Sequence, residues 1–147
     1  MAKLQVELVT AEGRVLSTEA DFVLARGSDG DLGVLPRHVP LLTPLRTGEL
    51  VVRNDGHDEY IFVAGGFLEV LPDKVVVLAD AAERAEDIDA SRAQAAKRRA
   101  EELLAENTDN VKVAASLERA MFRLRVAELR KHRHGGGPRQ HEPTSTE

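Results

Sequence analysis

The fold of this chain is decided by residues 87–110, which form the stretch DIDASRAQAAKRRAEELLAENTDN. Most of these residues are strong helix formers, and neither Gly nor Pro occurs between residues 87 and 134. Asp87 or Asp89 can cap a helix that we expect to cover residues 90–106. Small apolar side chains recur every three or four positions along it, at Ala93, Ala96, Ala100 and Leu103. The stretch therefore predicts a helix with a narrow apolar stripe, which ends at the polar residues 107–110.

A second helix is predicted after this break, because Val113, Leu117, Met121 and Leu124 repeat at helical spacing. A four-residue polar connection between two amphipathic helices is typical of an antiparallel helical hairpin. Alanine buries little area, so we expect the hairpin, over residues 85–131, to pack weakly. The remaining residues, 132–147, are HRHGGGPRQHEPTSTE and offer no apolar side chain to bury. They are expected to form a disordered tail.

The residues before the hairpin indicate β-structure. Leu4, Val6 and Leu8 alternate with polar neighbours, which is the period of a half-buried strand. Further strands are expected at residues 21–26, 50–53, 60–64, 66–71 and 74–79, between turn signals at 12–13, 54–56 and 72–73. The turn at 54–56 indicates a hairpin with a loop longer than two residues. The predicted fold class is α+β, with an N-terminal antiparallel β-sandwich over residues 1–84 followed by a C-terminal antiparallel two-helix hairpin.

The composition excludes several classes of protein. The 147 residues carry a net charge of −5 and contain no cysteine, which excludes disulfides, thiol catalysis and Cys-ligated metals. Aromatic residues make up only 3%, so no base-stacking surface for nucleic acid is expected. No apolar run reaches the ~20 residues of a membrane helix, and the N-terminus lacks the apolar core of a signal peptide. We therefore expect a small protein of the cytosolic side, with an acidic front half and a basic hairpin.

The sequence contains none of the common catalytic motifs. It has no P-loop, no dinucleotide-binding glycine pattern, no H-E-x-x-H and no G-x-S-x-G. His38 lies between Pro36 and Pro40, where a rigid loop is more plausible than a catalytic base. Gly65 and Gly66 are expected to mark a bulge or a close backbone approach rather than a phosphate cradle. The chain is thus expected not to be an enzyme and to hold no metal.

Four arginines of the hairpin can meet if the two helices fold on each other. Arg92 and Arg99 share a face of the first helix, and Arg119 and Arg123 share a face of the second. Their guanidinium groups would lie near Glu83 and Asp89, where they could hold a phosphate. Ordinary surface ion pairing, worth about 0–1 kcal/mol per pair, explains the same spacing and stays open as the alternative.

Four segments of the sequence occur together, in the same order and spacing, in one protein family. They are GDLGVLPRHVPLLT at residues 30–43, AGGFLEV at 64–70, VVVLADAAE at 75–83 and EDID at 86–89. Over residues 3–131 the chain resembles the epsilon-subunit family of bacterial F-type ATP synthases. The family's fold, a β-sandwich followed by a two-helix hairpin, agrees with the fold expected from the residues.

The resemblance implies a non-catalytic subunit of the central stalk, or rotor, of a proton-translocating ATP synthase. Its implied partners are the gamma subunit, the membrane c-ring and the alpha/beta catalytic head. Ser28, Asp31 and Leu32 match the loop that faces the ring, and His38 matches the surface near gamma. The hairpin would restrain ATP hydrolysis when it extends into the head. The implied location is the cytoplasmic face of the bacterial cell membrane, with contact to the membrane only through the complex.

Some members of this family bind ATP through the pattern [IL]-D-x-x-R-A. Residues 88–93, IDASRA, fit this pattern. The resemblance then implies contacts to ATP from Glu83, Ile88, Asp89, Arg92, Ala93, Arg99, Arg119 and Arg123. It requires no cofactor and admits ATP only as a regulatory ligand. A free-standing β-sandwich adaptor with a regulatory helix pair is the alternative function.

Overall fold

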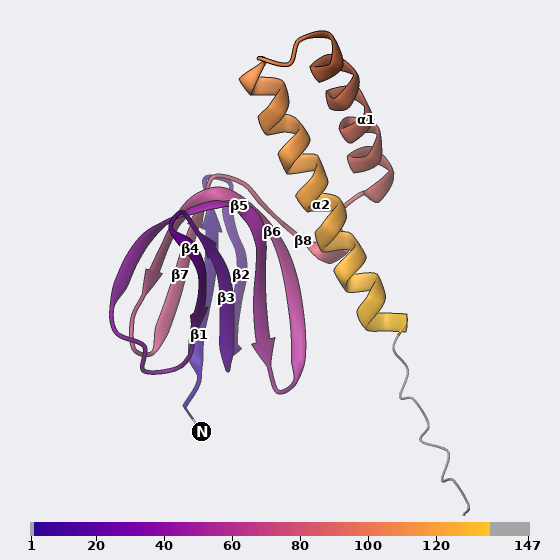
Figure 1. Cartoon of the computed structure of the whole chain (residues 1–147). Coiled ribbons are helices and arrows are strands. Elements are labelled where there is room, and N and C mark those ends of the chain that lie inside the picture. Colours follow the sequence, from indigo (N-terminus) through magenta and orange to yellow (C-terminus); the bar gives the residue numbers. More distant parts are fainter. Residues whose placement is uncertain (1, 136–147) are drawn as a thin grey trace, which may run out of the picture.

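Figure 1 shows a computed structural model of the chain, which describes residues 2–135. The N-terminal part is a sheet and the C-terminal part consists of helices, as the sequence predicts. The strands are β1 (Leu4–Thr10), β2 (Gly13–Ala20), β3 (Phe22–Gly27), β4 (Gly30–Val34), β5 (Leu41–Asn54), β6 (His57–Val70), β7 (Lys74–Ala79) and β8 (Ala82–Arg84). The 3₁₀-helix η1 (Ala85–Asp87), α1 (Ala90–Glu106) and α2 (Val111–Gly135) follow.

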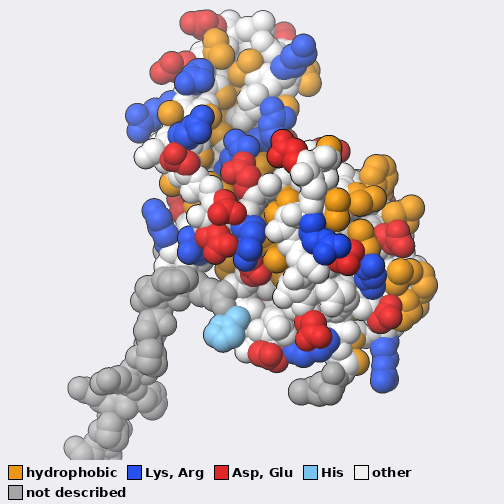
Figure 2. All heavy atoms as spheres, turned by 180° about the vertical axis from the view of Figure 1, so that it is seen from behind, with side chains coloured by type: hydrophobic (Ala, Val, Ile, Leu, Met, Phe, Trp, Pro, Cys, Tyr) orange, Lys and Arg blue, Asp and Glu red, His pale blue; other side chains and the backbone are white. Residues whose placement is uncertain are grey.

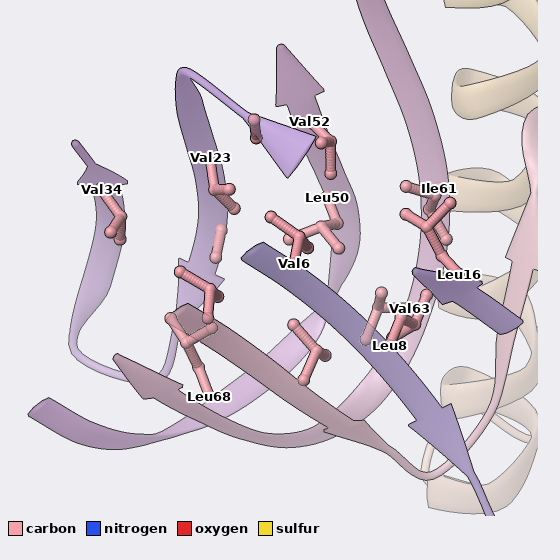
Figure 3. Close-up of a cluster of buried hydrophobic side chains, with 14 of the residues drawn as sticks. Val6, Leu8, Leu16, Val23, Val34, Leu50, Val52, Ile61, Val63 and Leu68 are labelled. Carbon is pink, nitrogen blue, oxygen red and sulfur yellow. The ribbon is translucent and has the colours of Figure 1, made fainter. Parts of the chain in front are cut away.

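The strands pair in the order β2-β1-β7-β6-β5-β3-β4, with β8 paired to β6. All pairs are antiparallel except β1 with β7, which are parallel. A parallel pair needs a long connection, and here the strands between β1 and β7 provide it. Their inward side chains form the main core, which Figure 3 shows between the facing strands. Leu4, Val6 and Leu8 are fully buried there, so the predicted alternation is confirmed. β2, β4 and β8 were not among the strands expected from the sequence.

The turn between β5 and β6 is shorter than the sequence analysis expected. β5 ends at Asn54 and β6 begins at His57, so only Asp55 and Gly56 lie between them. Their φ angles of 50° and 79° are those of a two-residue hairpin turn. The expectation of a longer loop was wrong because polar residues at the start of β6 obscured the strand. Arg53 and Asp58 pair across this end at 2.7 Å.

β6 is one continuous strand through Gly65 and Gly66, where two separate strands were expected. Gly66 has φ +124°, and a Cβ added there would lie 2.0 Å from the carbonyl oxygen of Leu78 on the neighbouring strand. Only glycine permits this approach of two backbones. The expected close approach at the glycine pair is therefore confirmed.

The helices begin where the sequence predicts. The Asp89 side chain accepts a hydrogen bond from the Arg92 backbone N–H at 3.1 Å and caps α1. Asn110 caps α2 in the same way, through the Val113 N–H at 3.2 Å. α2 continues to Gly135, past the expected end at residue 131, because no helix breaker occurs before that glycine. The rest of the predicted disordered tail, residues 136–147, lies outside the described residues.

α2 attaches the hairpin to the sheet, and α1 lies beside α2 (Figure 1). The contact is a small apolar cluster, separate from the main core, whose buried members are Phe62, Ala85 and Val126. Tyr60, Ala64, Ile88 and Phe122 pack around it. We call this group the docking cluster. Two ion pairs flank it, Arg123–Glu83 at 2.5 Å and Arg125–Glu49 at 3.3 Å. No described helix is both long and apolar enough to cross a membrane.

Candidate functional site

A cavity of about 500 Å³ lies where β8, η1, α1 and α2 meet. Its lining includes seven of the eight residues that the sequence analysis grouped as ATP contacts: Glu83, Ile88, Asp89, Arg92, Ala93, Arg99 and Arg123. Asp87, Ala95 and Ala96 complete the wall. The volume is within the range of roughly 300–1,000 Å³ that is usual for small-molecule sites. The fold thus gathers residues that are up to 40 positions apart in the sequence.

Arg123 links this cavity to the docking of α2. Its Nη2 forms an ion pair with Glu83 at 2.5 Å, and its guanidinium lies 5.2 Å from the centre of the Phe62 ring. The Nε atom is buried and has no hydrogen-bond partner among the described residues. Arg123 is therefore held in place by the sheet, and its buried Nε is an unsatisfied donor.

Arg92 and Arg99 lie on the other wall of the cavity, on α1. Both are exposed, and within residues 2–135 neither side chain forms an ion pair. Asp89 caps the helix that carries them, so its carboxylate orients the start of α1 rather than neutralising these charges. The two guanidinium groups are thus available to an anion.

Arg119 lies outside the cavity, although it was grouped with the other arginines. It is exposed on α2, and its Nη2 donates to the Ser116 hydroxyl at 3.3 Å. Four residues of helix place it about 6 Å further from the sheet than Arg123. The cavity lies at the end of the hairpin that is next to the sheet. Arg119 is one helical turn further away and therefore does not reach it.

The charges around the cavity suit a ligand with both anionic and donor groups. Three arginines and three carboxylates line it, so the wall is balanced in charge. Guanidinium groups favour phosphate oxygens, whereas Glu83 and Asp87 can accept hydrogen bonds from hydroxyl or amino groups. Among the side chains of residues 2–131, no three histidines, aspartates or glutamates gather as metal ligands.

A larger cavity, of about 730 Å³, lies between the β5–β6 turn and the end of α2. Its lining contains more acidic than basic side chains, and its Arg84 already pairs with Glu59 and with Glu86 at 3.2 Å. None of the sequence-predicted residues lines it. The smaller cavity is the better candidate for an anionic ligand.

The residues predicted to contact partners lie in the β3–β4 hairpin and in the loop after β4. Ser28 and Asp31 are exposed at the β3–β4 turn, whereas Leu32 packs partly into the main core. Asp31 accepts hydrogen bonds from Arg26 and, at 2.9 Å, from Arg46. Burial tends to raise the pKa of Asp31, but these two arginines hold it below its ordinary value. His38 is half-buried in the loop after β4.

Sequence reasoning missed an exposed apolar surface beside His38. Leu35, Val39, Leu42, Phe67 and Leu78 are between 52% and 72% exposed. Phe67 pairs with Leu78 across neighbouring strands, and Figure 2 shows hydrophobic side chains gathered on this side of the sandwich. Such a patch on a small protein indicates a protein interface. The adjacent apolar residues Phe67 and Leu68, and the unbroken apolar run at residues 75–79, were sequence signals of it.

Comparison with known proteins gives the same family for both halves of the chain. Residues 3–85 match the model "ATP synthase, Delta/Epsilon chain, beta-sandwich domain", and residues 86–128 match "ATP synthase, Delta/Epsilon chain, long alpha-helix domain". The chain is 51% identical over 135 residues to the ATP synthase epsilon chain of Dehalococcoides mccartyi, covering 89% of this chain and 96% of that one. It is 48% identical over 126 residues to that of Nitratidesulfovibrio vulgaris, with 84% and 94% covered.

Two solved assemblies contain a chain with a similar fold. One is the Euglena gracilis mitochondrial ATP synthase, OSCP/F1/c-ring, with TM-score 0.65, 21% identity and coverage of 91% of this chain and 82% of that chain. The other is the central stalk and c-ring of the Tetrahymena thermophila mitochondrial ATP synthase, with TM-score 0.52, 15% identity and coverage of 87% and 96%. At these identities the likeness concerns the fold.

Proposed function

Because the chain belongs to the delta/epsilon-chain family of ATP synthases, we propose that its cavity binds ATP as a regulatory ligand that holds the helical hairpin on the sandwich. The chain is the epsilon subunit of an F-type ATP synthase, a non-catalytic part of the central stalk. Its partners are the gamma subunit, the c-ring and the alpha/beta head, and the family identity displaces the free-standing adaptor. It associates with the membrane complex as a peripheral subunit, and we propose the cytoplasmic face of the bacterial cell membrane as its location.

The observation that carries the ATP proposal is the gathering of Arg92, Arg99 and Arg123 around one cavity. These arginines come from both helices, and Arg123 is also fixed to the sheet through Glu83. A ligand that contacts these arginines together with Glu83 of β8 binds the docked hairpin better than the released one. It therefore shifts the equilibrium toward docking by its difference in affinity for the two states.

We further propose how the two states act in the complex. The released hairpin extends into the catalytic head and restrains ATP hydrolysis, and its basic second helix meets acidic surfaces there. The docked hairpin leaves rotation free. On the sandwich, the turn with Ser28, Asp31 and Leu32 faces the ring, and the apolar surface beside His38 faces gamma. These placements follow the family resemblance and the exposure of the residues.

A calorimetric titration of the full chain with ATP tests the ligand. We expect saturable binding that Arg123→Ala weakens about 10- to 150-fold, since a hydrogen bond to a charged group contributes about 1.5–3 kcal/mol. Arg92→Ala should act in the same direction. Arg119→Ala is the matched control, because it removes the same charge from the same helix outside the cavity. Equal losses for Arg119→Ala and Arg123→Ala, or no binding at millimolar ATP, would refute the proposed site and leave the stalk assignment intact.

A further inference from the structure

A continuous row of charged side chains connects the β3–β4 turn with α2. Arg46 donates to Asp31 at 2.9 Å, and Asp31 also accepts from Arg26. The other Nη atom of Arg26 donates to Oε1 of Glu49, and the same oxygen forms an ion pair with Arg125 of α2 at 3.3 Å. The charges alternate in sign along the whole row. It is separate from the cavity described above and shares no residue with it.

Glu49 is the buried centre of this row. It is only 4% exposed, and its Oε1 atom accepts a hydrogen bond from Arg26 and forms an ion pair with Arg125. Burial tends to raise the pKa of Glu49, but the hydrogen bond and charge of Arg26 hold it below its ordinary value, so the carboxylate stays ionised. Its Oε2 atom is buried and accepts no hydrogen bond from the described residues. One oxygen of this buried carboxylate thus interacts with two arginines.

Arg26 has two ways to satisfy its guanidinium group. In the structure it bridges two acids, with Nη1 on Asp31 and Nη2 on Glu49. If the charge of Asp31 is engaged elsewhere, both nitrogens can turn to Glu49 and form a forked pair with Oε1 and Oε2. Glu49 would then be fully paired by Arg26 alone, and its attraction for Arg125 on α2 would fall.

We propose that a cationic side chain of a partner surface, binding Asp31, loosens the docking of α2 through Arg26 and Glu49. Asp31 can be reached, because its side chain is 44% exposed at the turn. Its internal partner Arg46 is 56% exposed and is readily displaced. Binding of a partner at the β3–β4 turn thereby shifts the equilibrium of the hairpin toward the released state. This inference is independent of ATP, because it uses none of the cavity residues.

The test measures how often α2 leaves the sheet in the full chain. The chain has no cysteine, so Val126→Cys places a single thiol at a position that is fully buried in the docking cluster. Its reaction with a thiol reagent reports opening of the docked state. Asp31→Asn, which imitates the engaged turn, should raise the labelling rate about 1.4- to fivefold, the range expected from about 0.2–1 kcal/mol for an exposed ion pair.

Two further variants make the test specific. Asp29→Asn removes the same charge from the same turn, and Asp29 has no ion pair within residues 2–135, so its effect should be smaller. Arg46→Gln should lower the labelling rate, because Asp31 then holds Arg26 alone. In an Arg125→Gln background, Asp31→Asn should have no effect.

Three results would overturn the proposal: equal effects of Asp29→Asn and Asp31→Asn, an undiminished effect without Arg125, or a faster rate with Arg46→Gln. Circular dichroism of each variant confirms that the sheet is folded. The substituted residues Asp29, Asp31 and Arg46 are all exposed, so the fold should tolerate each change.

Discussion

Replacing Val126 by alanine should release the hairpin without unfolding the sandwich. Val126 is fully buried in the docking cluster and does not belong to the main core. The change removes two methyl groups, which cost about 0.8 kcal/mol each, or roughly 1.6 kcal/mol together. If the site does not collapse, the cavity adds up to about 1 kcal/mol, at roughly 24 cal/mol per Å³. The released state should therefore become about 15- to 80-fold more populated relative to the docked state.

The assay is the labelling of a cysteine at position 85. Ala85 is 8% exposed and packs in the same cluster as Val126, so Ala85→Cys hides a thiol that opening uncovers. The labelling rate of Ala85→Cys is compared with and without Val126→Ala. Val111→Ala is the matched control, since it makes the same change on the same helix at a residue that is 79% exposed. It should change the rate less than twofold.

Equal labelling rates for the Val126 and Val111 variants would show that the docking cluster does not hold the hairpin. Loss of the sheet signal in circular dichroism would refute the separation of the docking cluster from the main core. Either result would remove the physical basis for a hairpin that leaves the sandwich while the sandwich stays folded.

Three further outcomes are expected of the full chain. The pKa of Glu49 is held below its ordinary value of 4.5, so its ionised form stabilises the fold above that pH. This stability is lost as the pH falls through the lowered pKa. Urea unfolding at a series of pH values should therefore show a fall in the free energy of unfolding at low pH that is smaller in Glu49→Gln. Gly66→Ala should destabilise the sandwich by about 2 kcal/mol or more, because its Cβ would meet the Leu78 carbonyl oxygen and its φ is strained. Gly56→Ala, with open space around the Cβ, should cost less in the same thermal melt. Asn110→Ala should lower helix stability by about 1 kcal/mol in urea unfolding, through loss of the α2 cap, and an unchanged midpoint would contradict that role.

The sequence predicted those features that depend on neighbouring residues. The bounds of α1 agree with the prediction because Asp89 provides a cap and the polar residues 107–110 end the helix. The strand with Leu4, Val6 and Leu8 was recognised because its burial alternates strictly. Local rules reach this far because the backbone choice at each position depends on a few adjacent side chains.

Features that depend on the rotation and offset of distant elements could not be predicted. Arg119 and Arg123 share a helix face, and only the height of the cavity along α2 separates them. The pair Arg125–Glu49 joins two domains across 76 positions and has no sequence signature. Val126 was not among the expected stripe residues, because the face of α2 that meets the sheet differs from the face that meets α1.

The contacts that attach the hairpin to the sandwich contribute a free energy similar to that of binding a ligand. The docking cluster has three fully packed members, and the flanking ion pairs of Arg123 and Arg125 are partly exposed. A ligand at 100 times its dissociation constant adds about 2.7 kcal/mol to the state that binds it. That is close to the loss expected from Val126→Ala, so a ligand that holds Arg123 should restore much of the docking in that variant. The sandwich has its own core, so its folding does not depend on such a ligand. The physical division between a fixed base and a releasable arm therefore lies at residue 85, where the sheet ends and η1 begins.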